Sequence, residues 1–198
     1  MFTQFTISNL QFSICNLQFI ISCLYFFLPA YFANMTPPIA KRLGVFRFLA
    51  RPIDFDKKFF GKPIFGSHKT WRGAILAFFI GFSTAIIQGL LFNFEFFKKL
   101  SIIDYSKINI FLFAFLISFG EVFGDLMFAF IKRRIGLKPG APFIPFDQTN
   151  YVFGCFLTLQ PYLKLDLRIW LTILILTFFL HIIFNRLGYH LKIHNAKW

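Results

Sequence analysis

One stretch of the sequence combines carboxylates, cations and apolar residues in a way that suits phosphate chemistry at a membrane. Ser118, Glu121, Asp125 and Lys132 are separated by three, four and seven residues. On a helix this spacing places all four side chains on one face, while Phe, Leu, Ile and Met occupy the other. Ionisable groups on an apolar membrane helix normally face a bundle interior or a water-filled cavity. This face is therefore a candidate site.

Two basic clusters accompany these acids: H-K-T-W-R at 68–72 and K-R-R-x-x-x-K at 132–138. Phosphate groups are bound by this mixture, because Arg supplies a bidentate fork, Lys a point charge and a hydroxyl fills a remaining direction. Membrane-interface anchors would also be basic. Such anchors do not require Glu121 and Asp125 on a membrane helix, or Asp147 just ahead of the next one. Cations beside acids favour a site for a metal ion and a polyphosphate.

The composition predicts that membrane helices position these groups. Of the 198 residues 57% are hydrophobic and 15% charged, which is typical of an integral membrane protein. We predict an all-α polytopic bundle with about five transmembrane helices. The expected spans are approximately 12–32, 74–92, 108–131, 151–163 and 169–187. In the third span, Gly120 and Gly124 are four residues apart and would let a neighbouring helix approach closely.

The distribution of cations predicts the topology. The segments 34–73, 132–148 and 186–198 hold nine, four and three Lys or Arg residues, against three and two in the turns on the other side. By the positive-inside rule the N-terminus lies outside and the C-terminus is cytoplasmic, which places the site on the cytoplasmic face of the plasma membrane. With the cations explained in this way, the net charge of +13 indicates anionic lipid or a phosphorylated substrate, and no nucleic acid.

Several other features carry no predicted function. Residues 1–11 are uncharged and are interpreted as a variable N-terminal extension, and the first span has no signal-peptide cleavage site, so it should remain a membrane helix. The three cysteines, at 15, 23 and 155, are expected to be small apolar residues. The stretch from Gly61 to Thr70 lacks the Gly-Lys-Thr order of a P-loop. We expect His181 to be a hydrogen-bonded interior residue, and His190 and His194 to be solvated.

Four motifs carry a resemblance to a known family. They are L-P-A-Y-F-A-N-M (28–35), F-G-S-H-K-T-W-R-G (65–73), G-D-L-x-x-x-F-I-K-R-R-x-G-x-K-P-G-A (124–141) and F-D-Q-T-N-Y-V-x-G (146–154). In this order they resemble the CDP-archaeol synthase family, within the wider phosphatidate cytidylyltransferases. The resemblance covers nearly all of the chain after about residue 24. It implies that 12–198 is a single integral membrane cytidylyltransferase domain.

The resemblance implies a reaction in which CTP and a lipid phosphate, with Mg²⁺, give a CDP-activated lipid and pyrophosphate for phospholipid biosynthesis. Catalytic roles are expected for Lys69, Asp125, Lys132 and Asp147. Metal ligation is expected for Asp125, Asp147 and Glu121. The expected substrate-binding residues are Lys69, Thr70, Arg72, Lys132, Arg133, Arg134 and Lys138.

The chain follows the archaeal-type pattern at Lys138-Pro139 and Gln148, but it departs from the family at Asn150, where Asp is usual. An asparagine can ligand a metal through its carbonyl oxygen but brings no charge, so a second metal is in question. We hypothesise that Glu121, one helical turn before Asp125, compensates.

Three alternatives stay open at this point. The chain could be a degenerate family member, or a non-catalytic membrane protein that binds anionic lipid or nucleotide. A small transporter is weaker, because we find no internal inverted repeat. The lipid is undecided between di-O-geranylgeranylglyceryl phosphate and diacyl phosphatidate, as are the choice of CTP over dCTP and the oligomeric state.

Overall fold

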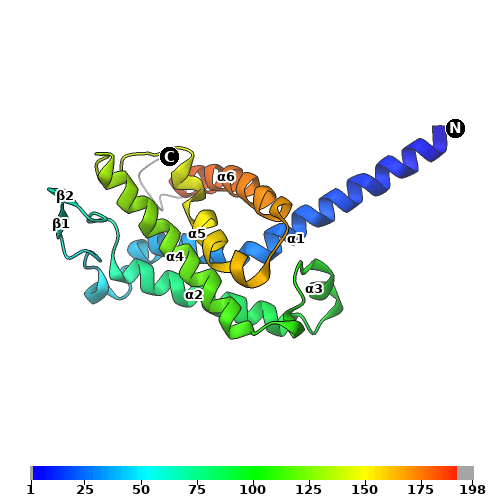
Figure 1. The fold of residues 1–198 in the computed structure, drawn as a ribbon, viewed down its shortest axis with the longest axis horizontal. Helices are drawn as coiled ribbons and strands as arrows, with labels where there is room; N and C mark the ends of the chain where they lie inside the picture. Colours follow the sequence, from blue (N-terminus) through cyan, green and yellow to red (C-terminus); the bar gives the residue numbers. More distant parts are fainter. Residues whose placement is uncertain (1, 191–198) are drawn as a thin grey trace.

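The computed structural model describes the backbone of residues 2–190 and the side chains of residues 17–190. Helices make up most of it, as Figure 1 shows. The all-α membrane bundle that the composition predicts is confirmed. The long helices are α1 (Phe2–Leu43), α2 (Trp71–Leu91), α4 (Ile110–Arg134), α5 (Phe146–Leu163) and α6 (Leu167–His190). The short elements are α3 (Glu95–Leu100), the 3₁₀ turns Arg47–Leu49 and Tyr105–Lys107, and the antiparallel strands β1 (Lys58–Phe59) and β2 (Lys62–Pro63).

Of the helices described, four are long and apolar enough to cross a membrane: Leu17–Leu43 of α1, then α2, α4 and α6. The predicted fifth span corresponds to α5, which is only 18 residues long and begins with polar side chains. The count of five spans and the orientation of the two ends stay predictions.

One boundary in the sequence analysis is wrong. The first span is predicted to end near residue 32, with a cytoplasmic loop from residue 34, but α1 continues through Pro37 and Pro38 to Leu43. Proline normally ends or kinks a helix. Here tertiary packing favours its continuation, since Gly73 of α2 presents no side chain to α1. A Cβ added at Gly73 would lie 3.3 Å from the Pro37 Cβ.

The predicted close approach at Gly120 and Gly124 is confirmed, and the partner is α5. A Cβ added at Gly124 would lie 3.0 Å from the Cα of Gly154, and one added at Gly120 would lie 2.8 Å from the Cα of Cys155. The backbones of α4 and α5 are therefore in direct contact. As a consequence, the C-terminal half of α4 lies beside the first turn of α5, where Asp147 is located.

An aromatic core fixes α1 against this pair. Phe26, Phe27 and Phe113 are at most 1% exposed, and Trp170 of α6 packs edge-on against both Phe26 and Phe27. Cys23 and Cys155 are buried free thiols, as predicted, and the side chain of Cys15 lies outside the described residues.

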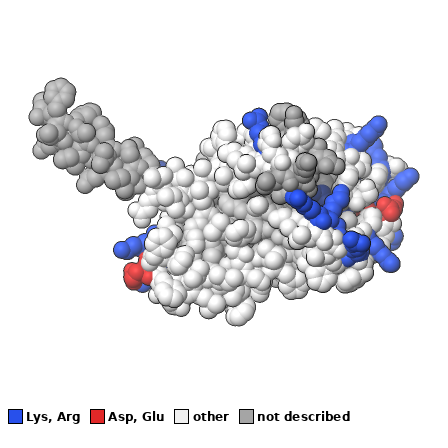
Figure 2. All heavy atoms as spheres, turned by 180° about the vertical axis from the view of Figure 1, so that it is seen from behind, with Lys and Arg blue, Asp and Glu red and all other residues white. Residues whose placement is uncertain are grey.

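On the face that Figure 2 shows, the charged side chains gather mainly towards two ends of the helix bundle, with a belt between them that has few charges. Most Lys and Arg side chains lie at the end that carries the β1–β2 hairpin and the end of α4 (Figures 1 and 2). The belt is what a helix bundle would present to lipid tails.

Candidate active site

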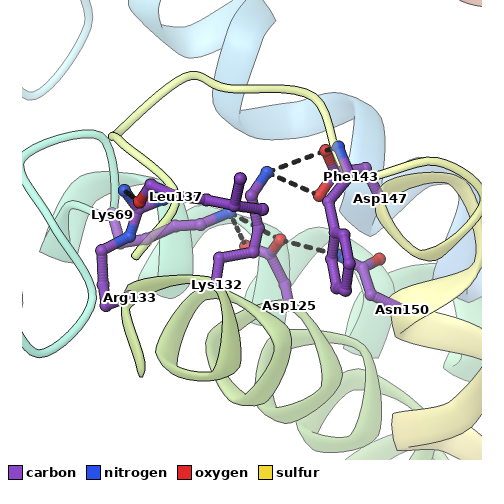
Figure 3. Close-up of polar contacts among 8 residues, drawn as sticks. All are labelled: Lys69, Asp125, Lys132, Arg133, Leu137, Phe143, Asp147 and Asn150. Carbon is purple, nitrogen blue, oxygen red and sulfur yellow. Dashed lines mark hydrogen bonds and ion pairs between the residues drawn. The ribbon is translucent and has the colours of Figure 1, made fainter. Parts of the chain in front are cut away.

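A cavity of about 370 Å³ lies where α4, α5 and the loop before α2 meet, with α1 and α6 forming the remaining wall. It brings together two predicted acids, Asp125 and Asp147, with three predicted cations, Lys69, Lys132 and Arg133. Their positions in the chain span nearly eighty residues, so the helix packing assembles this group. Figure 3 shows these side chains converging.

Two lysine–aspartate pairs form the centre of the site (Figure 3). Lys69 Nζ lies 2.6 and 2.7 Å from the two carboxylate oxygens of Asp125, and Lys132 Nζ lies 2.8 Å from each of those of Asp147. The Lys132 side chain is only 10% exposed, whereas the other three are about 30% exposed. Each carboxylate is thus neutralised and oriented by a lysine from another segment of the chain.

Backbone pairing holds Lys69 in place. The Ile53 N–H donates to the Lys69 carbonyl at 2.8 Å, and the Trp71 N–H donates to the Arg51 carbonyl at 3.0 Å. These bonds fix the 66–71 segment as a short ladder against 51–53. The Lys69 side chain is therefore presented from a defined backbone.

The Asp54 carboxylate stabilises the same loop through backbone hydrogen bonds. It is 5% exposed, and its carboxylate accepts hydrogen bonds from the N–H groups of Phe65 and Gly66 at 2.9 Å and of Asp56 at 3.1 Å. Burial raises the pKa of the Asp54 carboxyl, but the backbone donors lower it more, and the net pKa lies below its ordinary value. The ionised Asp54 carboxylate therefore stabilises the loop that carries Lys69.

The start of α5 positions Asp147 and Asn150. Asp147 Oδ2 accepts a hydrogen bond from the Phe143 N–H at 2.8 Å, which ties the carboxylate to the preceding loop. Asn150, one turn later, donates from Nδ2 to Asp125 Oδ1 at 3.1 Å, while its carbonyl oxygen accepts from the Tyr151 N–H at 2.7 Å. The Asn150 side-chain oxygen thus accepts one backbone hydrogen bond, and the side-chain nitrogen donates to Asp125.

Arg133 supplies a cation that is not neutralised by an acid. It lines the cavity, is 5% exposed, and among the described residues forms no ion pair within 4.0 Å. One guanidinium nitrogen donates to the Leu137 carbonyl, which closes the turn after α4 (Figure 3). Together with the two lysines, Arg133 gives the cavity three cations against two carboxylates.

Four predicted substrate contacts do not line this cavity. Arg134 donates to the carbonyls of Phe59, Lys62 and Pro63, so it anchors the β1–β2 hairpin. Thr70 caps α2, accepting from the Gly73 N–H at 3.2 Å. Arg72 donates to the Val45 carbonyl at 3.3 Å, and Lys138 is exposed. Sequence spacing identified these residues as cations or hydroxyls near the site, but it could not tell which way their side chains point.

Glu121 is on the predicted helix face, but it lines a second, smaller cavity of about 60 Å³. Thr70 also lines that cavity, and Lys69 and Asp125 line both cavities. Glu121 is 3% exposed and Ser118 is fully buried. Glu121 Oε2 and Ser118 Oγ have no hydrogen-bond partner among the described residues. A buried carboxylate oxygen without a partner is costly, which is characteristic of a functional site.

The donor set suits a hard cation shared with a substrate. Within the part of the chain described, no three His, Cys, Asp or Glu side chains gather into a complete metal cage. Mg²⁺ is usually held by one or two carboxylates plus substrate phosphates and water. Asp125 and Asp147, in a cavity that three cations also line, match that arrangement.

Several polar cavity residues were not among the predicted site residues, including Gln148, Asn34, His181 and Asn185. Gln148 is 5% exposed, with its Oε1 unpartnered among the described residues. The other three are polar residues on the long helices α1 and α6. Their position in apolar spans was the signal that could have identified them.

Comparison with known proteins shows the family of the chain. CDP-archaeol synthases from Methanococcus aeolicus and Pyrococcus furiosus are 33% and 34% identical to the chain over 175 and 172 residues. The alignments cover 86% of this chain in both cases, and 92% and 93% of the relatives. A solved structure described as an intramembrane enzyme for archaeal membrane lipids biosynthesis shares the fold, with a TM-score of 0.66 at 22% identity, covering 82% of this chain and 91% of that chain.

The CarS-like family, described as CDP-archaeol synthase, matches residues 16–198. The resemblance carried by the four sequence motifs is thereby confirmed. The chain belongs to the CDP-archaeol synthase family.

Proposed function

We propose that this chain is a membrane cytidylyltransferase that condenses CTP with a lipid phosphate to give a CDP-activated lipid and pyrophosphate. The observation that carries the proposal is the pair of lysine-held carboxylates, Lys69–Asp125 and Lys132–Asp147, in one cavity at the end of an apolar bundle. Membership of the CDP-archaeol synthase family supports the same reaction.

The chemistry needs little acid–base help from the protein. A phosphate monoester has a second pKa of about 6, so a lipid phosphate is mostly doubly ionised near neutral pH. One of its oxygens attacks the α-phosphorus of CTP. The new P–O bond forms as the bond from the α-phosphorus to the α,β-bridging oxygen breaks, and pyrophosphate leaves with that oxygen. Alignment of the two phosphates and neutralisation of their charge are therefore the main catalytic requirements.

The two ion pairs fit this requirement because their lysines and carboxylates change partners when substrate binds. Without substrate, each lysine neutralises a carboxylate, which keeps charges at the membrane boundary compensated. When a triphosphate enters, Lys69, Lys132 and Arg133 neutralise its phosphate oxygens, and the carboxylates are released to hold a cation. In both states each carboxylate of the two ion pairs has a cation beside it.

Asp125 and Asp147 would hold the Mg²⁺, and Glu121 would supply a third carboxylate from the adjoining cavity. When bound, the ion neutralises phosphate oxygens and stabilises the charge that develops on the departing pyrophosphate. Asn150 donates to Asp125 and fixes the orientation of that carboxylate.

The lipid substrate and the membrane complete the proposal. The chain lies in the plasma membrane with its cavity on the cytoplasmic face, where CTP is available, and the cation distribution supports this orientation. The archaeal-type motif pattern favours an isoprenoid ether lipid phosphate, di-O-geranylgeranylglyceryl phosphate, over diacyl phosphatidate.

The test uses the purified full chain in detergent, with Mg²⁺ and either lipid phosphate offered in parallel. Wild-type protein should make CDP-lipid, with the ether lipid preferred, whereas Asp125→Asn and Asp147→Asn should not. Asp166→Asn is a matched control, since Asp166 lies in the turn before α6 and its side chain accepts a hydrogen bond only from the Arg168 N–H among the described residues. If wild-type protein binds CTP but transfers nothing to either lipid, the chain is a non-catalytic binding protein and the proposal fails.

A further inference from the structure

The wall of the cavity formed by α1 and α6 differs in chemistry from the wall that carries the ion pairs. Asn34 of α1 and His181 and Asn185 of α6 line it. All three are polar but uncharged or weakly basic, and all are partly buried. Among the residues that the structure describes, none forms a hydrogen bond with the side-chain amide of Asn34 or Asn185. The cavity thus has an ionic wall and an amide wall.

The amide wall is built into the packing of the two helices. Tyr31 of α1 and Thr177 of α6 share a hydrogen bond of 3.0 Å, and Thr177 is fully buried. Asn34 lies three residues after Tyr31, and His181 and Asn185 lie four and eight residues after Thr177. These intervals keep each residue on the helix face of its predecessor. The Tyr31–Thr177 bond therefore sets the separation of the two helices directly beside the amides.

Amides suit a different part of a nucleotide from the part that lysines suit. Lysine and arginine only donate hydrogen bonds and carboxylates only accept them, whereas an asparagine side chain does both. The edge of cytosine also mixes the two kinds of group, with an amino donor at N4 and acceptors at N3 and O2. Phosphates require only donors. The two walls therefore match the two ends of one nucleoside triphosphate.

We propose that Asn34 and Asn185, with His181 on the same wall, bind the cytosine base and determine the preference for CTP. This inference rests on the proposed function. The inference adds a base-specificity site to that function. The site lies on α1 and α6, which carry no residue predicted to act on the phosphates. The glycerol of a lipid phosphate is the competing occupant, but its ether oxygens only accept hydrogen bonds and so leave half of each amide unmatched.

The experiment compares CTP with tripolyphosphate, which has the phosphates of CTP without the base or sugar. Binding of CTP, UTP and tripolyphosphate to the full chain with Mg²⁺ is measured by calorimetry for wild-type protein, Asn34→Leu, Asn185→Leu and the double variant. Asn93→Leu is the control, because Asn93 is exposed and lies just after α2, at the opposite end of that helix from Lys69.

Wild-type protein should prefer CTP to UTP. Each leucine substitution should weaken CTP binding by about tenfold, the effect of losing one or two hydrogen bonds, while leaving tripolyphosphate binding within about twofold. The CTP-to-UTP preference should approach one in the double variant. Asn93→Leu should change none of these values.

Two results would overturn the inference. One is that the substitutions leave the ratio of CTP to tripolyphosphate affinity unchanged, or change only the KM for the lipid. The other is that both the leucine variants and the matching alanine variants lose tripolyphosphate as well, since the asparagines would then support the fold and not the base. Failure of the proposed function is distinguishable, because wild-type protein would then bind CTP selectively without transferring its cytidylyl group.

Discussion

The amide nitrogen of Asn150 lies 3.1 Å from Oδ1 of Asp125, which places an uncharged donor beside the carboxylate that Lys69 also holds. An aspartate at 150 would bring a second negative charge to within hydrogen-bond distance of the first. Two carboxylates this close repel each other unless a cation lies between them. The asparagine therefore adds a hydrogen bond to Asp125 without adding a second negative charge beside it.

Asn150→Asp should make the site depend more strongly on metal. We expect a lower Mg²⁺ concentration for half-maximal transfer, because the site gains a charge. In EDTA we expect a lower Tm than for wild-type protein, because the repulsion is no longer compensated. Activity across a Mg²⁺ titration and thermal unfolding with and without EDTA measure the two effects.

Glu121→Gln is the counterpart of that substitution, since it replaces a carboxylate group of the adjoining cavity with an amide of the same size. It should raise the Mg²⁺ concentration needed for half-maximal transfer. An unaltered Mg²⁺ dependence in Glu121→Gln would show that Glu121 has no part in metal binding.

Lys69→Met and Lys132→Met should each lower kcat/KM for CTP by about 10²- to 10³-fold, the range seen when one preorganised donor to a developing charge is removed. Each also leaves a carboxylate in the cavity without its cation. Steady-state kinetics at saturating lipid are the appropriate measurement. Lys99→Met, in the exposed helix α3, should behave as wild type. Equal effects of all three substitutions would contradict specific roles for Lys69 and Lys132.

Asp54 should make the Lys69 loop sensitive to acid. Its folded-state pKa is lower than its unfolded value, so its contribution to stability is complete above about pH 4 and is lost as the pH falls through the folded pKa. Asp54→Asn should accordingly lower the Tm at pH 6, with the difference from wild type closing below about pH 4. A difference in Tm that stays constant down to pH 3 would contradict this account.

Gly124→Ala should separate α4 from α5, because its Cβ would meet the backbone of Gly154, which cannot move aside. We expect a loss of about 2 kcal/mol or more in stability, with transfer activity falling in parallel. Gly89→Ala in α2 is the matched control. The three atoms nearest to its Cβ would all belong to the Ile110 side chain, which can change rotamer. Comparable losses in the two variants would argue against a specific backbone contact.

The parts of the site that a single helix carries were predictable from the sequence. The face of Ser118, Glu121, Asp125 and Lys132, and the close approach at Gly120 and Gly124, follow from the helical period alone. The continuation of α1 through Pro37 and Pro38 did not follow, because local propensity favours a break there. Contact with Gly73 in another helix decides the outcome.

Relationships between segments were harder to predict. Lys69 and Asp125 are 56 residues apart, and no periodicity indicates that they meet. Arg134 follows Arg133 directly, yet one side chain anchors a hairpin and the other lines the cavity, because successive helical residues point about a quarter-turn apart. The amide wall depends on which faces of α1 and α6 pack together, information that resides in the tertiary structure.

Cytidylyl transfer predicts different fates for the two ends of the triphosphate, and these can be followed separately. Purified protein receives the lipid phosphate, Mg²⁺ and CTP labelled at either the α- or the γ-phosphorus. The account predicts that α-label enters the lipid while γ-label leaves as pyrophosphate, and that Asp125→Asn abolishes both. γ-Label in the lipid, or α-label transfer that persists in Asp125→Asn, would contradict cytidylyl transfer at this site.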